Sequence, residues 1–94
     1  MSLSKRNLEQ CFENAVNTNA LFIGVKISTR GSAEPEVIIN GRGNFNTKLE
    51  YYRDKYDDNL VLKSYDGIAI VGITWGDSYD DIECDFEDTV EGGL

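Results

Sequence analysis

The chain has 94 residues, a formal charge of −8 and no histidine. This length fits one domain with a thin core, so association with another chain is a natural supplement to its stability. The absence of histidine excludes Ser-His-Asp and Cys-His catalysis, histidine general bases and zinc sites that need imidazole.

The rest of the composition is that of a folded protein without a membrane segment. Hydrophobic residues make up 40% of the chain and aromatic residues 11%, which argues against wholesale disorder. Cys11 and Cys84 are too few and too far apart for a disulfide framework or a CxxC motif. No apolar run approaches the roughly 20 residues that span a bilayer, and no signal peptide opens the chain. We therefore expect a cytoplasmic protein in a reducing compartment.

The negative charge is concentrated in the second half of the chain. Residues 1–56 carry eight basic and six acidic side chains, a formal charge of +2. Residues 57–94 carry one basic and eleven acidic side chains, a formal charge of −10. The acidity therefore belongs to a local segment. We expect one domain over 1–76, with an acidic segment over 77–94 that is docked on it or trails from it.

The first predicted element is an amphipathic helix near the N-terminus. Its apolar side chains recur at i, i+3, i+4, i+7 and i+8, the spacing of one helix face. These residues are Leu8, Cys11, Phe12, Ala15 and Val16. Ser2 or Ser4 is placed to cap the start, and the polar run 17–19 ends the helix. Cys11 lies on the buried stripe and is expected to be an inert small hydrophobe.

A hairpin and a second helix are predicted next. Residues 20–29 are rich in β-branched and aromatic types, as in a strand, and 36–40 form a second strand after a turn over 30–35. Helical spacing then returns. It is carried by Phe45, Leu49, Tyr52 and Tyr56, with Asn44 or Asn46 as the cap.

Two further strands complete the predicted sheet. They cover 60–65 and 68–75, and Asp66-Gly67 between them is typical of a type I′ hairpin turn. The last strand is the most apolar segment and is expected at the centre of the sheet. The predicted fold is a two-layer α+β domain in the order α-β-β-α-β-β, with a four-stranded antiparallel sheet and both helices on one face.

The face of the predicted sheet opposite the helices mixes apolar and polar side chains. Its residues are Phe22, Val61, Lys63 and Tyr65. Such a face suits an oligomer interface or a partner surface, and we expect a homo-oligomer.

The acidic segment allows two local structures. Acids alternate with Ile82, Cys84 and Phe86 at period two, as in an edge strand whose carboxylates repel unwanted pairing. Tyr79, Ile82 and Phe86 also fit one face of a short helix capped by Ser78, the alternative to the edge strand. In both cases the apolar side chains dock and the acids face water.

The acids themselves have a plain and a sharper interpretation. The plain one is a solvated face that confers solubility. The sharper one is an array of carboxylates that competes for a basic nucleic-acid-binding groove, so that the protein acts as an acidic mimic. The candidate partner-binding residues are Asp77, Asp80, Asp81, Glu83, Asp85, Glu87 and Asp88. Their spacing does not match an EF-hand loop, so no metal is expected.

The glycine-rich corner before the second helix is the candidate site for a small ligand. It consists of Asn40, Gly41, Arg42, Gly43, Asn44 and Phe45. Backbone N–H groups at the start of a helix, with Arg42 beside them, suit an anion such as a nucleotide phosphate. The plain alternative is a tight corner between strand and helix, because the third glycine of the dinucleotide fingerprint is missing.

Direct nucleic-acid binding and catalysis both receive weak support. Tyr51 is the exposed aromatic residue among basic neighbours on the second helix, but the net charge opposes nucleic-acid affinity. Carboxylate pairs at Glu34 and Glu36, and at Asp57 and Asp58, lack an activated nucleophile and a metal frame. We expect a protein that is not an enzyme and has no cofactor, with a carboxylate-metal enzyme as the remaining alternative.

Several stretches resemble small uncharacterised proteins carried by phages and prophages of Gram-positive bacteria. They are EVIIN at 36–40, Arg42, NF at 44–45, KLEYY at 48–52 and YDDNLVLK at 56–63, within a resemblance that covers about residues 20–83. The resemblance implies an accessory role in the host cytoplasm, often inhibition or sequestration, and supplies no catalytic residues. We therefore expect a binding module for a host or phage protein, with a nucleotide-like anion as an alternative ligand.

Overall fold

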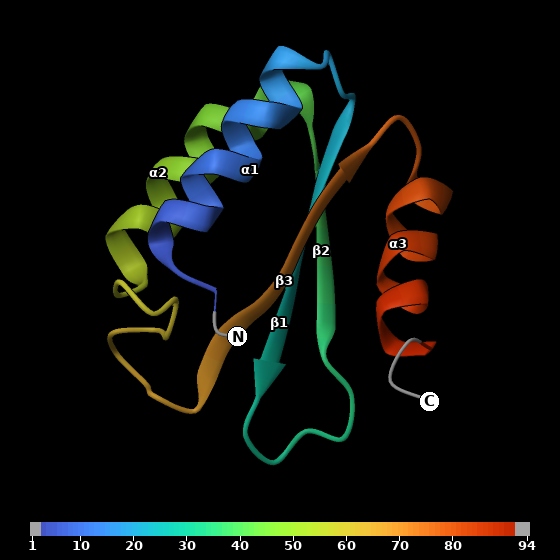
Figure 1. The fold of residues 1–94 in the computed structure, drawn as a ribbon. Coiled ribbons are helices and arrows are strands. Elements are labelled where there is room, and N and C mark those ends of the chain that lie inside the picture. The colour runs from blue at the N-terminus through green and yellow to red at the C-terminus, as the bar shows by residue number, and fades with distance from the viewer. Residues whose placement is uncertain (1–2, 92–94) are drawn as a thin grey trace.

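The computed structural model describes the backbone of residues 3–91 and the side chains of 3–86. Three helices surround a three-stranded antiparallel sheet (Figure 1). The elements are α1 (Lys5–Asn17), β1 (Phe22–Thr29), β2 (Glu36–Gly41), the 3-10 turn η1 (Arg42–Asn44), α2 (Phe45–Lys55), β3 (Ile68–Gly76) and α3 (Tyr79–Glu91). The strand order is β2-β1-β3, with α1 and α2 on one face and α3 on the other.

Helix α1 begins and ends as its sequence predicts. The Asn7 backbone N–H donates to Ser4 Oγ at 3.3 Å, and the Ser4 N–H donates to Asn7 Oδ1 at 2.9 Å, which forms a capping box. Asn19 follows the helix with a φ of 59°, a left-handed conformation that turns the chain toward β1. The predicted N-terminal helix and its Ser4 cap are confirmed.

The main core lies between the sheet and the pair formed by α1 and α2. The rings of Phe12 and Phe45 meet edge to face with centroids 6.2 Å apart, which joins the two helices. The fully or almost fully buried apolar residues of this core are Leu8, Phe12, Ala15, Ala20, Ile23, Val25, Ile27, Phe45, Tyr52, Tyr56, Leu60 and Ile70. The helices and strands contribute most of these residues, and Ala20, Tyr56 and Leu60 come from the connecting segments, whereas Val16 of the predicted helix stripe is exposed.

A bulge in β3 lets both halves of this strand face the main core. Lys26 of β1 pairs with Gly72 and the next residue, Ile27, pairs with Ile70, so Val71 is the extra residue. Side chains alternate across a strand, and one inserted residue reverses that alternation. Ile70 before the bulge and Trp75 after it consequently pack on the same core.

Helix α3 covers the opposite face of β1 and β3. Ile82 is fully buried and Phe86 nearly so, and both lie over glycines in the strands, at Gly24 and Gly72. The predicted two-layer, four-stranded architecture is therefore wrong, although the α+β class is right. The sheet face that was expected to be an interface is covered by α3. Phe22 of β1, on this face, packs against Tyr79 of α3 with ring centroids 5.0 Å apart.

The strand predicted over 60–65 does not form. Asp57 Oδ1 accepts the backbone N–H groups of Asn59 at 2.9 Å and Val61 at 3.0 Å, which makes a side-chain-capped turn. Leu60 adopts a φ of 61° within that turn and its side chain is fully buried. The segment keeps only isolated bridges, which join Leu62 to Tyr56 and Val61 to Ala69. Its apolar residues fill the core from a loop.

Two predictions about the last strand also fail. Asp66 and Gly67 are not among the described residues with positive φ, so their turn is not type I′. Strand β3 lies at an edge of the sheet, and β1 is central. The segment expected to be the neighbouring strand is a loop that reaches only the start of β3. Among the described residues, the remainder of this apolar strand therefore has no strand paired on its outer edge.

Candidate interaction site

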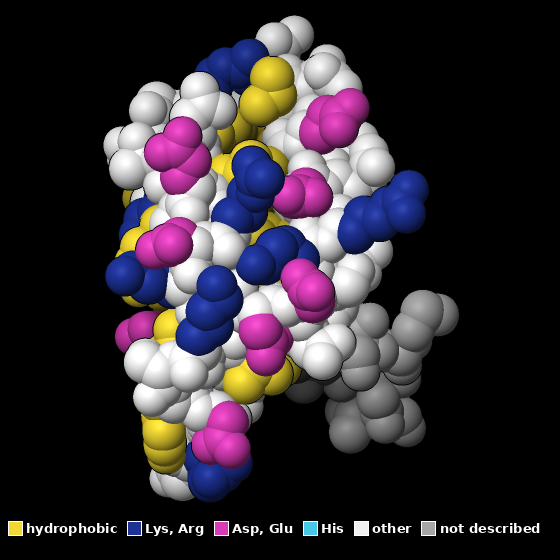
Figure 2. Space-filling model, turned by 90° about the vertical axis from the view of Figure 1, so that its left-hand side faces the viewer, with side chains coloured by type: hydrophobic (Ala, Val, Ile, Leu, Met, Phe, Trp, Pro, Cys, Tyr) yellow, Lys and Arg dark blue, Asp and Glu magenta, His cyan; other side chains and the backbone are white. Residues whose placement is uncertain are grey.

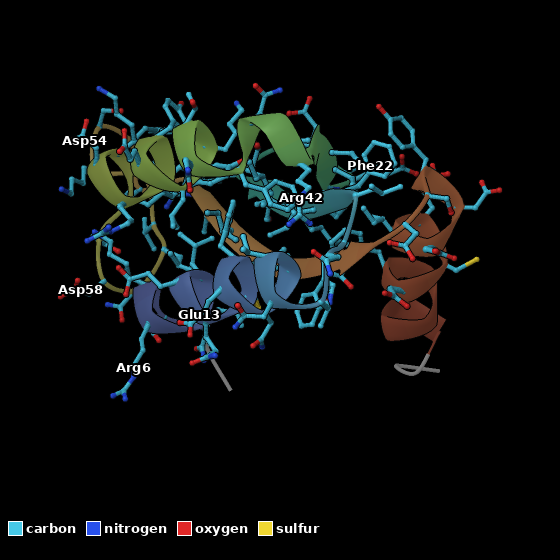
Figure 3. All side chains as sticks on the ribbon, turned by 90° about the horizontal axis from the view of Figure 1, so that it is seen from above. Arg6, Glu13, Phe22, Arg42, Asp54 and Asp58 are labelled. Atoms are coloured by element: carbon cyan, nitrogen blue, oxygen red, sulfur yellow. The ribbon has the colours of Figure 1, made fainter. Side chains whose placement is uncertain are left out.

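Arg42 of the glycine-rich corner is committed to the fold. Its Nη1 donates to the Ala20 carbonyl and its Nη2 to Asn19 Oδ1, both at 3.2 Å. Its backbone N–H donates to the Leu21 carbonyl at 2.9 Å. Figure 3 shows Arg42 lying between the helices, whereas Arg6 and Asp58 project outward elsewhere. This arginine ties the α1–β1 corner to η1.

The other candidate residues of this corner do not converge on a ligand. Gly41 has a φ of −76°, and a Cβ added at Gly41 or Gly43 would meet nothing within 4 Å. Phe45 is buried in the main core, and the Asn44 side chain makes no capping hydrogen bond. Asn40 Nδ2 is buried and has no hydrogen-bond partner within the part of the chain that the structure describes. The corner is thus a packed connection between β2 and α2, and a side chain at Gly41 or Gly43 would meet no steric obstacle.

We expect Arg42→Ala to lower the free energy of unfolding by about 1–2 kcal/mol, because two charge-assisted hydrogen bonds across the α1–β1 corner are lost. Thermal and urea unfolding measure the change. The matched control is Arg30→Ala, whose guanidinium faces Asp66 at 3.5 Å with both side chains mostly exposed. The control should change stability by less than about 0.5 kcal/mol, and equal losses would contradict a special role for Arg42.

The candidate acids are arranged by α3 in two groups. Asp81 and Asp85 lie one turn apart beside β3: Asp81 Oδ2 accepts the Asp77 N–H at 3.3 Å, and Asp85 Oδ2 accepts the Thr74 hydroxyl at 2.7 Å. Asp80 and Glu83 are exposed on other parts of the helix surface. The side chains of Glu87 and Asp88 lie outside the described residues.

The acidic residues also support the helix that carries them. Asp80 and Asp81 occupy the first turn of α3, where the helix dipole favours negative charge. Ser78 Oγ accepts the Asp81 N–H at 3.1 Å, so the helix and cap considered for this segment are the ones found. One face then docks through Ile82 and Phe86, which leaves the carboxylates at the surface.

Two grooves run along β3 beside α3, and residues that flank α1 contribute to their other side. One has a volume of about 380 Å³ and the other about 460 Å³. The first is lined by Thr18, Ala20, Trp75, Gly76, Asp77, Asp81, Cys84 and Asp85. The second is lined by Leu3, Lys26, Val71, Gly72, Ile73, Thr74, Asp85 and Phe86. They share Asp85 and together follow β3 from Val71 to its end at Gly76.

Strand β3 lines both grooves, and Figure 1 shows this strand in front of the other strands. At the start of the strand, the Ile70 N–H donates to the Leu60 carbonyl, and the Leu62 N–H donates to the Ile68 carbonyl. From Val71 to Gly76, the described part of the chain places no second strand on this edge. Charged residues and proline usually protect an edge strand from further pairing, and the segment 68–76 contains neither. The sequence shows this composition, but it indicates an unprotected edge only once the strand pairing is known.

The surface of α1 and α2 differs from that of α3. Acidic and basic side chains are interspersed over it (Figure 2). Arg53 Nε lies 2.9 Å from Glu9 Oε2, and Lys55 Nζ lies 3.5 Å from Asp54 Oδ2. Tyr51 is exposed there, with Lys48 Nζ 5.2 Å from its ring centroid. This surface mixes both charges, whereas 77–91 contains acids alone.

The remaining candidate groups are dispersed. Asp57 caps the loop described above, and no group of three or more acidic or cysteine side chains suited to a metal ion occurs among the described residues. Burial raises the pKa of the Cys11 thiol, which keeps it protonated on the helix stripe. Within the described range, no helix is long and apolar enough to cross a membrane.

Comparisons with known proteins add no relative to this description. No protein-family model matches the chain, and no match was found among curated proteins or solved structures. The candidate site therefore rests on the β3 edge, the two grooves and the acidic helix beside them.

Proposed function

We propose that this protein is a non-enzymatic interaction module that binds a basic protein through the acidic surface of α3. The observation that carries the proposal is a segregation of charge. Residues 77–91 contain eight acids and no base, on a helix whose apolar side already packs on the sheet. Its Asp80 and Glu83 are exposed to solvent.

The physical effect of such a surface is attraction and orientation of a cationic partner. Summed charges of one sign raise association rates and discriminate against partners of the same sign. A protein that neutralises nucleic-acid phosphates presents a suitable basic surface, and a host or phage protein of this kind is the partner class that we propose. The mixed charges of α1 and α2 offer no comparable field.

The test is neutralisation of exposed acids on the two surfaces. The double variant Asp80→Asn, Glu83→Gln should bind a short polylysine peptide about three- to tenfold more weakly at low salt, since each exposed charge contributes a fraction of a kcal/mol. The matched control, Glu50→Gln with Asp54→Asn, removes the same charge from α2 and should bind almost as the parent does. Calorimetric titration at two salt concentrations measures both. Equal weakening by the two double variants would overturn the proposal, because net charge alone would then explain binding.

A further inference from the structure

The geometry points to a specific binding mode, which rests on the proposed function: the partner inserts an extended segment that pairs with β3 from Val71 to Gly76 as a fourth strand. Addition of a strand to a sheet edge is a general mode of peptide recognition. In Figure 1 this edge lies between α1 and α3, so the helices would flank the added strand.

The backbone of β3 presents groups for such pairing. The Ile70 N–H donates outward to the Leu60 carbonyl, and the Ile68 carbonyl accepts outward from the Leu62 N–H. Along a strand, the backbone N–H and C=O groups of successive residues point to opposite edges, and their side chains point to opposite faces. Ile73 and Trp75 contribute to the same core as Ile68 and Ile70, so their N–H and C=O groups point to the same outer edge. An added strand would satisfy these groups with backbone hydrogen bonds.

The spacing of the acids matches an extended partner. Asp81 lies against Gly76 and Asp85 bonds to Thr74, so the carboxylates flank alternate positions of β3. Side chains one helical turn apart are separated by about 6 Å along the axis, close to the roughly 6.8 Å between alternate residues of a strand. Lysine or arginine at positions i and i+2 of the added strand would reach the two carboxylates.

The other face of the added strand would meet different chemistry. Leu3 is partly buried beside Val71 and Ile73 in one groove, and Trp75 lines the other. An apolar side chain at position i+1 would contact this side. The preferred partner segment therefore alternates basic and apolar residues, with the basic ones facing α3.

Charge argues for this partner over a second copy of the chain. Antiparallel pairing of β3 with its own copy would place the two α3 helices on the same face of the joined sheet, next to each other. Each helix carries Asp81 and Asp85 beside the junction, and Asp77 lies just before the helix in the same groove. Like charges brought together in this way oppose association, whereas a basic segment is attracted.

The test compares blocked peptides of identical composition with the intact protein. One alternates lysine and valine, and the other groups the lysines together and the valines together. Trp75 is the sole tryptophan and lies in the groove, so its fluorescence reports binding. The alternating peptide should bind at least tenfold more tightly and slow hydrogen exchange at the Ile73 and Trp75 amides. A version N-methylated along the edge that faces β3 should lose this advantage.

The outcomes separate the two proposals. Equal binding of both peptides, with weakening by the Asp80→Asn, Glu83→Gln variant, would overturn strand addition and leave the acidic interaction surface standing. Binding of neither these peptides nor polylysine would overturn both. Concentration-dependent dimerisation that slows exchange at Ile73 and Trp75 without peptide would assign the edge to a second copy. The variant Asp81→Asn, Asp85→Asn should weaken the alternating peptide at least fivefold, and unchanged affinity would also contradict the mode.

Discussion

Gly24→Ala is expected to destabilise the protein by about 2–3 kcal/mol, because a methyl group at this position has no space. An added Cβ would overlap Ile82 Cγ2 and lie 3.3 Å from the Phe86 ring. Ile82 is fully buried against the sheet, so it cannot move aside without displacing α3. Overpacking of a close contact costs about 1–3 kcal/mol. Chemical denaturation measures the loss.

The matched control for Gly24 is Gly41→Ala, at a position with an ordinary φ and open space around the added methyl. It should leave the protein unchanged or stabilise it by up to about 1 kcal/mol, since alanine restricts the unfolded chain. The loss of stability in Gly72→Ala should fall between those of the other two variants, because a Cβ added at Gly72 would lie 3.1 Å from the Phe86 ring and 3.3 Å from Lys26 Cβ. Similar effects of Gly24→Ala and Gly41→Ala would show that α3 does not pack on β1 as described.

Raising the pH from 10 to 12 should remove about 2 kcal/mol of stability through Tyr52 alone. Burial chiefly raises the pKa of its hydroxyl to about 12 from an ordinary value near 10, with further contributions from Tyr56 and Tyr51. Below pH 10 the group is protonated in both states. Between pH 10 and 12 the unfolded chain releases the proton more readily, so unfolding becomes more favourable.

The variant Tyr52→Phe isolates this contribution. It removes a buried hydroxyl that has no hydrogen-bond partner among the described residues, so stability at pH 8 should be equal to the parent or about 1 kcal/mol higher. Its decline between pH 10 and 12 should be smaller by about 2 kcal/mol, although the raised pKa of Tyr56 leaves some decline. The control, Tyr65→Phe at an exposed site, should follow the parent. Parallel pH profiles for the parent and Tyr52→Phe would refute the assignment.

The predicted elements that survived are those specified by local signals. The stripe containing Leu8 and Phe12 carries its own helical period, and Ser4 supplies the cap. The hairpin of 22–41 and helix 45–55 likewise follow from periodicity and breaking residues. The predicted strand over 60–65 failed because composition does not reveal that Asp57 Oδ1 bonds to two of the following N–H groups. That side chain forms a turn where a strand was predicted.

The candidate sites also divide into features that the local sequence shows and features that depend on tertiary contacts. Arg42 looked suited to an anion because it lies in a glycine-rich corner beside the backbone N–H groups at the start of a helix, yet its partners are Asn19 and Ala20, more than twenty residues earlier. The acids of 77–91 were evident from the sequence, and the apolar residues Ile82 and Phe86 among them were expected to dock. Their alignment with the β3 edge was not foreseeable, since it depends on which strand lies at the margin of the sheet.

The sequence by itself determined the α+β class, the first two helices, the hairpin and the concentration of negative charge near the C-terminus. These features depend on residues close together in the chain. The tertiary structure alone decided that β1 is central, that Val71 forms a bulge and that α3 covers Gly24 and Gly72. Strand pairing and helix docking join distant residues, and their outcome depends on competing contacts across the whole core. The edge of β3 beside Asp81 and Asp85 exists only as a result of that competition.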